Sequence, residues 1–442
     1  MTRKKVLVVG SGGREHAICW ALRHTSAQPL ELFCAPGNAG IGEYAQLVPS
    51  SVDDHVQLAD FARSAGIHLT FVGPEAPLAA GIVDTFESLN LPIVGPTKKT
   101  SQLEASKVFA KEFMARHAIP TAAFRVANSP SEAVDVIRTG EIDSGSNRIV
   151  IKADGLAAGK GVVVATSREE AEKAVDDLMI KQLAGPAAGR VVIEETLDGK
   201  EASLLLFSDG RDYVLMPAAK DHKRIGEGDV GPNTGGMGSI TDPSVLDDAT
   251  LETVVKRIVE PTLAGARDEG FPFRGVLFLG LMLTAGGPKL LEYNVRFGDP
   301  ETQAILIRLQ TDLFSIFEAI RHGDLRNLTV DWTEGSSACV VAANRGYPGT
   351  YEKGAEIKGL DSFLGQAQVQ IFHAGTSQSP DGSLLATGGR VLSVATAASD
   401  LDSALNLCYE ALQGIHWEGI QYRRDIGRPG WSKPQEVRTT SR

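Results

Sequence analysis

Short apolar runs in the first hundred residues alternate with segments whose apolar positions recur at helical spacing. Strands that alternate with helices are typical of a doubly wound, mainly parallel sheet. We therefore expect an N-terminal α/β domain over 1–103, ended by Pro96 and Thr97. The predicted strands are 5–9, 30–34, 67–72 and 92–94, and the predicted helices are 14–23, 56–64 and 78–89.

The rest of the chain mixes helix and strand patterns. We expect a central domain over 104–330 and a small α+β domain over 331–428, followed by a polar, loosely ordered tail at 429–442. Helices are predicted at 102–117, 249–269 and 400–413. Strands are predicted at 148–152, 161–165, 190–194, 202–208, 275–283, 288–294, 337–343, 369–372 and 389–394, with glycine-rich turns at 155–161 and 226–238.

Composition narrows the function classes. The 442 residues carry a net charge of −11, which argues against a nucleic-acid partner because that footprint is basic. The four cysteines lie far apart without a C-x-x-C pair, so we expect a reduced cytoplasmic chain and no zinc site. No apolar stretch approaches the roughly 18 residues that a membrane span needs, and the short N-terminal run is interpreted as a strand rather than a signal peptide.

The segment LEYNVRFGDPE at 291–301 is the most informative in the chain. Strand alternation puts Glu292, Asn294 and Arg296 on one face. A carboxylate and an amide oxygen can share a hard cation such as Mg²⁺, and an arginine on that face can neutralise charge on a transferred group. The alternative is an edge strand with a solvated face.

Two glycine loops suit phosphate groups. GSGGREH at 10–16 follows the first strand and opens a helix, where free N–H groups can meet a phosphate. Glu15 occupies the third glycine position of a dinucleotide fingerprint and no acid follows the second strand, so a nicotinamide cofactor is improbable and a structural turn is the alternative. IKADGLAAGKG at 151–161 is not a P-loop, but it is suited to a mobile flap with Lys152 and Lys160; a solvated hairpin is the alternative.

Two further segments are candidates for ligand contact. The strand end VVIEETLDGKE at 191–201 can offer backbone groups to an adenine and a carboxylate to a ribose. The alternative is that its paired acids are solvated, and a solvated side chain is also the alternative for Lys107 on the preceding helix. The segment at 219–238 has six glycines over twenty positions together with charged residues, and loops of this length are usually functional or disordered. Its charges suit a small zwitterion or a phosphate.

Together these segments resemble the phosphoribosylamine–glycine ligase (glycinamide ribonucleotide synthetase) family of the ATP-grasp superfamily. The resemblance covers about residues 4–427, with Tyr293 in place of a commoner Phe and with the C-terminal tail as small departures. It is carried by GSGGREHA (10–17), APGNAG (35–40), VGPEAPLAAGIVD (72–84), SKVFAKEFM (106–114), IKADGLAAGKGVVVA (151–165), DHKRIGEGDVGPNTGGMG (221–238), YNVRFGDPETQ (293–303), FHAGT (372–376), GGRVLSV (388–394) and RRDIG (423–427).

The resemblance implies a multidomain α/β and α+β fold, with a central ATP-grasp domain whose flap lobe spans about 122–192. It also implies ATP-dependent joining of glycine to 5-phosphoribosylamine through glycyl phosphate, giving glycinamide ribonucleotide, ADP and phosphate in de novo purine biosynthesis. ATP is then a co-substrate and Mg²⁺ or Mn²⁺ the metal. We expect a cytoplasmic monomer with small-molecule partners and without nucleic-acid or membrane partners.

The resemblance also assigns roles to individual residues. Glu292 and Asn294 would bind the metal, and Arg296, Asp299 and Lys223 are the catalytic candidates. The ATP-binding candidates are Lys107, Lys152, Gly155, Gly159, Lys160, Gly161, Glu194, Glu195, Leu197 and Glu201. The substrate-binding candidates are Gly12, Gly13, Arg14, Glu15, Asn38, Asp221 and Asn233.

Two rival hypotheses remain open. A biotin-type carboxylase would share the ATP-grasp fold but would carry other substrate loops in place of 10–16 and 221–238. A regulatory module that binds nucleotide without turnover is the non-enzymatic alternative, and the intact Glu292, Asn294 and Arg296 argue against it.

Overall fold

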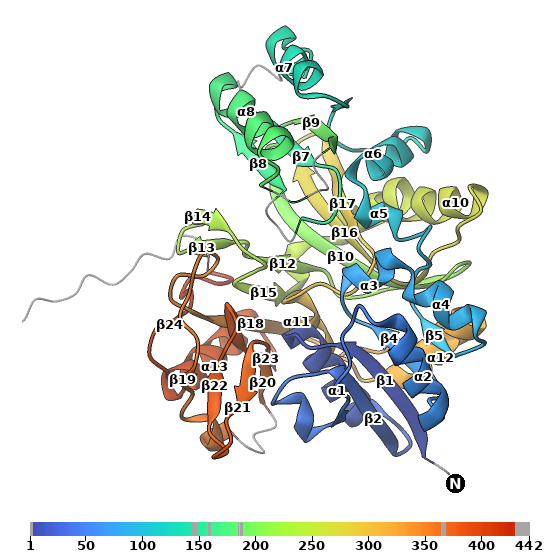
Figure 1. The fold of residues 1–442 in the computed structure, drawn as a ribbon, viewed down its shortest axis with the longest axis vertical. Coiled ribbons are helices and arrows are strands. Elements are labelled where there is room, and N and C mark those ends of the chain that lie inside the picture. Colours follow the sequence, from blue (N-terminus) through green and yellow to red (C-terminus); the bar gives the residue numbers. More distant parts are fainter. Residues whose placement is uncertain are drawn as a thin grey trace, which may run out of the picture.

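The computed structural model describes residues 3–142, 148–157, 161–183, 185, 189–363 and 368–428. The described strands form five sheets, and three of these organise the molecule (Figure 1). They are a parallel sheet near the N-terminus, a four-stranded sheet in the upper lobe and a ten-stranded sheet between and beside them. Residues 429–442, and with them the predicted tail, lie outside the described residues, as do Gly159 and Lys160.

The N-terminal sheet has the order β3-β2-β1-β4-β5, and every neighbouring pair is parallel. Alternate residues of β1 enter two different cores: Val6 and Val8 pack on the side of α1, whereas Leu7 and Val9 pack on the side of α2 and α4. Both faces are therefore covered, which confirms the predicted doubly wound sheet. The elements are β1 Lys4–Gly10, α1 Gly13–Thr25, β2 Leu30–Pro36, the 3₁₀ turn Ile41–Glu43, β3 Gln46–Leu47, α2 His55–Ala65, β4 Leu69–Val72, α3 Glu75–Ala80, α4 Ile82–Ser88 and β5 Ile93–Val94.

Two helices predicted as continuous are each divided in two. The helix predicted at 78–89 is replaced by α3 and α4, because Gly81 adopts a left-handed conformation with φ of 101°. The helix predicted at 102–117 is divided into α5 (Gln102–Ala105) and α6 (Lys107–Arg116) by Ser106, whose backbone is extended. The Ser106 side chain accepts the Phe109 amide and so begins α6 as its N-cap.

The upper lobe is built on the antiparallel-paired sheet β6-β9-β7-β8, with α7 and α8 against it (Figure 1). Helices α7 and α8 are absent from the predictions, although both begin with a capping serine, Ser129 and Ser167. The elements are β6 Phe124–Ala127, α7 Pro130–Thr139, β7 Ile149–Ala153, β8 Val162–Ala165, α8 Arg168–Val175, the π turn Asp176–Ile180 and β9 Val191–Glu195.

The ten-stranded sheet runs along the path β17-β16-β10-β12-β15-β18-β23-β20, with β11 beside β10 and β24 beside β18. The antiparallel pairing of β15 with β18 joins the C-terminal strands to those of the middle of the chain. The elements from the middle are β10 Lys200–Asp209, β11 Tyr213–Leu215, β12 Ala219–Asp221, β15 Gly238–Thr241, the 3₁₀ turn Pro243–Val245, α9 Asp248–Val254, the π turn Val255–Val259, α10 Glu260–Asp268, β16 Arg274–Thr284, β17 Gly287–Asn294, α11 Glu301–Leu306, α12 Leu313–His322 and the 3₁₀ turn Leu325–Asn327.

The segment 219–238, predicted as a loop, is largely strand. Besides β12 it forms the hairpin of β13 (Arg224–Gly226) and β14 (Val230–Asn233). The C-terminal segment fixes this hairpin: Arg423 Nη1 donates to the Arg224 carbonyl at 3.0 Å, and Asp425 accepts the Gly228 amide at 2.8 Å. The loop prediction was wrong because hydrogen bonds from residues about 200 positions later in the chain hold this glycine-rich segment in a hairpin.

The remaining elements complete the C-terminal region, where α13 packs on β18 and β23. Within the described residues, no helix is long and apolar enough to cross a membrane. The elements are β18 Ser336–Asn344, β19 Ala355–Glu356, the 3₁₀ turn Leu360–Phe363, β20 Val369–His373, β21 Thr376–Gln378, β22 Leu384–Ala386, β23 Arg390–Ala398, α13 Leu401–Gly414 and β24 Ile420–Gln421.

Candidate active site

The end of β17 presents the predicted polar face. Glu292, Asn294 and Arg296 are partly exposed, whereas the alternating Tyr293 and Val295 are buried. Glu292 lies opposite Gly280 of β16, where a Cβ would approach the Glu292 Cγ to 3.2 Å. The strand alternation therefore places the three side chains as the sequence predicts.

Glu292 is surrounded by positive charge. Burial opposes its ionisation, but Lys223, Lys107, Lys152 and Arg296 together lower the pKa of this carboxyl to about 2. No described residue donates a hydrogen bond to its oxygens. The carboxylate is thus ionised and has free acceptor positions, as a metal ligand must.

Arg296 is held by acids that the sequence analysis did not single out. Its Nε donates to Glu75 at 3.2 Å, and its Nη2 donates to Glu104 at 2.8 Å and to the Asn294 Oδ1 at 3.2 Å. Burial works against the charge, yet the two carboxylates raise the pKa of Arg296 above its ordinary value. Glu104 also accepts the Val295 amide at 2.7 Å, so the guanidinium is fixed relative to the strand that carries it.

A buried ion triad lies beneath the expected ATP site. Glu194 forms ion pairs with Lys152 Nζ at 3.0 Å and with Lys111 Nζ at 3.2 Å, and all three side chains are nearly inaccessible to solvent. Lys111 also donates to Thr121 at 2.6 Å. Burial lowers the pKa of Lys111 to about 8, although Glu194 opposes the shift. Both ion pairs involve Glu194 Oε2, whereas Glu194 Oε1 is buried without a hydrogen-bond partner among the described residues.

The other ATP-binding candidates surround this triad. Glu195 accepts from Lys289 at 2.9 Å and from the Ala123 amide, whereas Glu201 pairs with Lys223 at 2.9 Å. Leu197 lies half-buried between β9 and β10. Lys107 is the first residue of α6, and its positive charge helps to lower the pKa of Glu292.

The glycine loop after β7 is closely packed where the structure describes it. Gly155 has a φ of 131°, a conformation that suits glycine. At Gly161 a Cβ would lie only 2.7 Å from that of Ala157. Asp154, before the loop, binds Arg190 at 2.6 Å and accepts Ser106 Oγ at 2.7 Å, so this end of the loop is tied to the start of α6.

A second charged group surrounds β12. Burial, and then the nearby Glu301, raise the pKa of Asp221 well above its ordinary value. Partial burial opposes the charge of Lys223, but Glu201, Glu292 and Asp221 raise its pKa. Glu301 is buried and its pKa is raised mainly by burial. Two carboxyl groups thus share a site with one lysine.

Arg390 joins Asp299 to the glycines before β15. Its guanidinium forms an ion pair with Asp299 at 3.0 Å and donates to the carbonyls of Asp299 at 2.8 Å and Gly235 at 2.6 Å. Asn233, at the end of β14, is exposed. A Cβ at Gly12 would lie 3.6 Å from the Asp299 Oδ2, so the first glycine loop adjoins this group.

The first glycine loop is held by its own acid and by Asn38. Glu15 accepts the Gly12 amide and the Arg14 Nε, each at 2.6 Å, and Arg14 Nη1 donates to the Phe297 carbonyl at 3.1 Å. Asn38 donates to the carbonyls of Ser11 and His373, each at 2.8 Å, and accepts the Ile41 amide. Gly13 begins α1. Glu15 and Asn38 therefore shape the loop through their side chains.

The geometry adds five residues to those expected from sequence. Four of them lie within the segments that carried the family resemblance, so that resemblance pointed to their neighbourhoods without identifying them. They are Glu75, Glu104, Lys111, Glu301 and Arg390, of which Glu104 alone lies outside those segments.

Comparisons with known proteins assign most of the chain to one family. Family models match the phosphoribosylglycinamide synthetase N domain at residues 4–104, its ATP-grasp (A) domain at 105–302 and its C domain at 337–429. A phosphoribosylamine–glycine ligase of Caldanaerobacter subterraneus subsp. tengcongensis is 45% identical over 422 residues, which is 96% of this chain and 99% of the relative.

Solved structures give the same result. The crystal structure of phosphoribosylamine–glycine ligase from Thermotoga maritima is 36% identical, with a TM-score of 0.82 over 96% of this chain and 100% of the other. Biotin carboxylase from Campylobacter jejuni is 14% identical, with a TM-score of 0.69 over 96% of this chain and 94% of the other. This second likeness concerns the fold alone.

Proposed function

The chain belongs to the phosphoribosylglycinamide synthetase family, and we propose on that basis how its residues perform the ATP-dependent ligation of glycine to 5-phosphoribosylamine. The products are glycinamide ribonucleotide, ADP and phosphate, in purine biosynthesis. One observation carries the assignment of residues, namely a connected series of charged groups. The Gly12 loop adjoins Asp299, Glu301 interacts with both Asp299 and Lys223, and Lys223 interacts with Glu292. ATP and both other substrates can therefore meet in one place.

ATP would lie between the upper lobe and β17. Lys107 and Lys152 would neutralise phosphate oxygens, and Gly155 and Gly161 would let the backbone approach them; Gly159 and Lys160 lie outside the described residues. The backbone from Glu194 to Leu197 would meet the adenine, because β9 ends at Glu195 and residues 196–198 pair with no described strand. Glu195 or Glu201 would reach the ribose; each now forms an ion pair with a lysine that a hydroxyl group could replace.

Glu292 and Asn294 would hold Mg²⁺ or Mn²⁺. Their oxygens suit a hard cation, and Glu292 has free acceptor positions. The four cations around Glu292 oppose a metal until phosphate oxygens arrive, so we expect the metal to bind together with the nucleotide. When bound, the cation would supply positive charge that neutralises charge developing on the phosphate oxygens.

Glu292→Gln is expected to raise the Mg²⁺ concentration for half-maximal rate by about 10- to 100-fold, the range seen when support for a metal ligand is lost. The amide keeps the shape but removes the charge. The rate should be measured against Mg²⁺ concentration at saturating ATP, with Glu356→Gln as the matched control because that carboxylate lies outside the candidate site and pairs with Lys358. An unchanged Mg²⁺ requirement would contradict the role of Glu292.

Glycine would bind near Asp221 and Glu301. A glycine carboxylate oxygen attacks the terminal phosphorus of ATP, ADP leaves, and the resulting glycyl phosphate has a leaving group that free glycine lacks. The paired acids would hold the glycine ammonium, whose positive charge relieves their mutual repulsion. Lys223 and Arg296 would neutralise the oxygens of the transferred phosphoryl group and of the acyl carbonyl.

The phosphoribosyl group would lie against the start of α1. Gly12 and Gly13 allow the phosphate to approach, and Arg14 adds a positive charge, while Glu15 and Asn38 keep the loop in shape. Asp299 and Asn233 would orient the amine as it attacks the glycyl carbonyl and releases phosphate. Because one chain supplies all of these groups, we propose a monomer, located in the cytoplasm.

The activity test is substrate dependence. ADP release should require glycine and phosphoribosylamine together, and glycinamide ribonucleotide should form in equal amount. Each substrate is omitted in turn in a coupled ADP assay, with product measured by mass spectrometry. Rapid ADP release with bicarbonate or another amino acid in place of glycine would reject the proposal.

A further inference from the structure

A second charged cavity lies at the end of β10 that is opposite Glu201. Its volume is about 390 Å³, and its walls come from the turn after β10, the ends of α10 and α12 and the start of β16. At about 3.3 Å per residue, the ten residues of β10 separate the cavity from Glu201 by roughly 30 Å. It is therefore distinct from the candidate active site.

Arginine side chains dominate the cavity. Arg211, Arg267, Arg274 and His322 line it, each from a different element. Within the described part of the chain, no carboxylate lies within the 4.0 Å ion-pair distance of the three guanidinium groups. Asp209 is in the wall, but its carboxylate accepts the amides of Arg211, Asp212 and Leu325. Its charge is thus directed into the protein.

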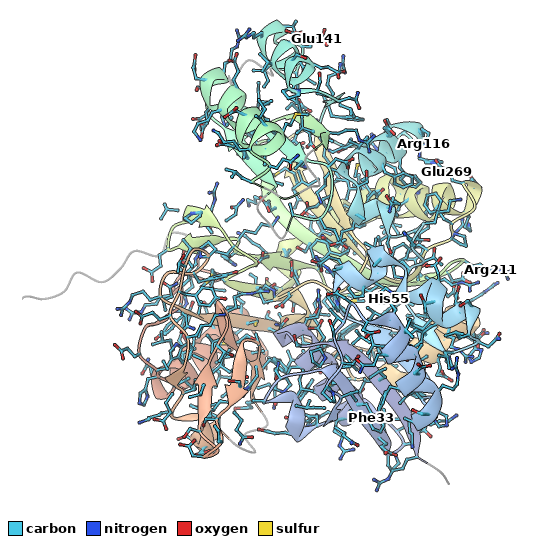
Figure 2. The ribbon with its side chains drawn as sticks, viewed as in Figure 1. Phe33, His55, Arg116, Glu141, Arg211 and Glu269 are labelled. Carbon is cyan, nitrogen blue, oxygen red and sulfur yellow. The ribbon has the colours of Figure 1, made fainter. Side chains whose placement is uncertain are left out.

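The local backbone leaves this space open. Gly210 and Gly323 adopt left-handed conformations with φ of 95° and 73°. A Cβ at Gly210 would lie 3.4 Å from the Arg274 side chain, so that arginine packs over the glycine turn. No heavy atom lies within 4 Å of a Cβ built at Gly323. In Figure 2, Arg211 projects outward at the right-hand edge of the molecule.

We propose that this cavity binds a small anion with two or more phosphate groups. Three guanidinium groups from separate elements supply more positive charge than one phosphate needs, and arginine pairs with phosphate oxygens in a bidentate manner. The volume falls within the range of small-ligand sites. The amides of Gly210, Arg211 and Gly323 are already hydrogen-bonded, so the side chains must hold the anion.

Inorganic pyrophosphate is the probe that tests the site, by calorimetric titration without Mg²⁺ at about 0.15 M salt. The variants are Arg211→Gln with Arg267→Gln, and the matched control Arg257→Gln with Arg168→Gln, which removes the same charge outside the cavity. Wild type and control should bind alike. The cavity variant should bind about 100-fold more weakly, roughly tenfold for each lost guanidinium contact.

A crystal soaked with pyrophosphate provides the second measurement, and density between Arg211, Arg267 and Arg274 is the expected result. Equal affinity of wild type and the cavity variant would overturn the proposal, because the anion would then bind elsewhere, such as at the ATP-phosphate lysines. Wild-type affinity weaker than about 1 mM would overturn it too. Ligase activity of the cavity variant should match wild type, and thermal denaturation verifies its folding.

Discussion

Replacing Arg296 with alanine is expected to lower kcat by about 10²- to 10³-fold, as when one group that stabilises developing charge is removed. Arg296 is held by Glu75, Glu104 and Asn294 before any ligand arrives, so little reorganisation is needed during the reaction. KM for ATP should change less than kcat, because the contact strengthens as charge moves onto the transferred group. Steady-state kinetics with all three substrates tests this.

The same substitution leaves Glu104 buried without its cation, so lost stability must be separated from lost catalysis. Glu104→Gln combined with Arg296→Ala removes both charges and should recover the melting temperature while leaving kcat low. Arg116→Ala is the control, since that arginine lies at the surface beside Glu269 (Figure 2). A rate within about threefold of wild type for Arg296→Ala would reject the catalytic role, given the size of the expected effect.

Glu194→Gln is expected to lower the free energy of unfolding by about 3–5 kcal/mol, the cost of leaving buried charges uncompensated. Glu194 is the shared partner of Lys111 and Lys152, and all three are nearly inaccessible. Urea denaturation measures the effect. Glu195→Gln is the control from the adjacent position, and its half-exposed pair with Lys289 should contribute about 1 kcal/mol or less.

The pH dependence gives an independent readout. Lys111 has a pKa near 8 in the folded protein and an ordinary value of 10.5 when unfolded. Between these values the unfolded chain binds more protons, so this lysine makes stability rise as the pH increases from about 8 to 10.5. Lys111→Met should lose that rise. In Glu194→Gln the rise should begin at a lower pH, because the carboxylate that favours the charged lysine is gone. A stability equal to wild type would contradict the role of Glu194 in compensating the two buried lysines.

The sequence predicted best those elements whose pattern is local. Strands β7, β9, β10 and β16 contain short continuous apolar runs, and each was predicted within two residues. Helix α11 was missed because every one of its residues is buried, so it has no polar face to reveal its period. Helix α7 was missed although Ser129 and Glu132 form a readable capping signal.

The same division holds in the candidate site. Strand alternation correctly brought Glu292, Asn294 and Arg296 to one face. The acids around Arg296 lie about 190 and 220 positions earlier in the chain, at distances over which no sequence period operates. Their pairing depends on how the N-terminal sheet packs against β17. The folded structure is therefore needed to show that Glu75 and Glu104 hold the guanidinium of Arg296.

The pairing of β15 with β18 has a consequence for any attempt to cut this protein into parts. A gene ended near residue 330 would leave β15 paired with β12 alone, and the edge of β15 that faces β18 would lose its hydrogen-bond partners. Such an unprotected border invites other polypeptides to add to it, and the fragment would precipitate. The nucleotide-binding region is therefore not expected to fold as a separate domain. A chimeric protein that contains it must also contain the C-terminal strands that complete its sheet.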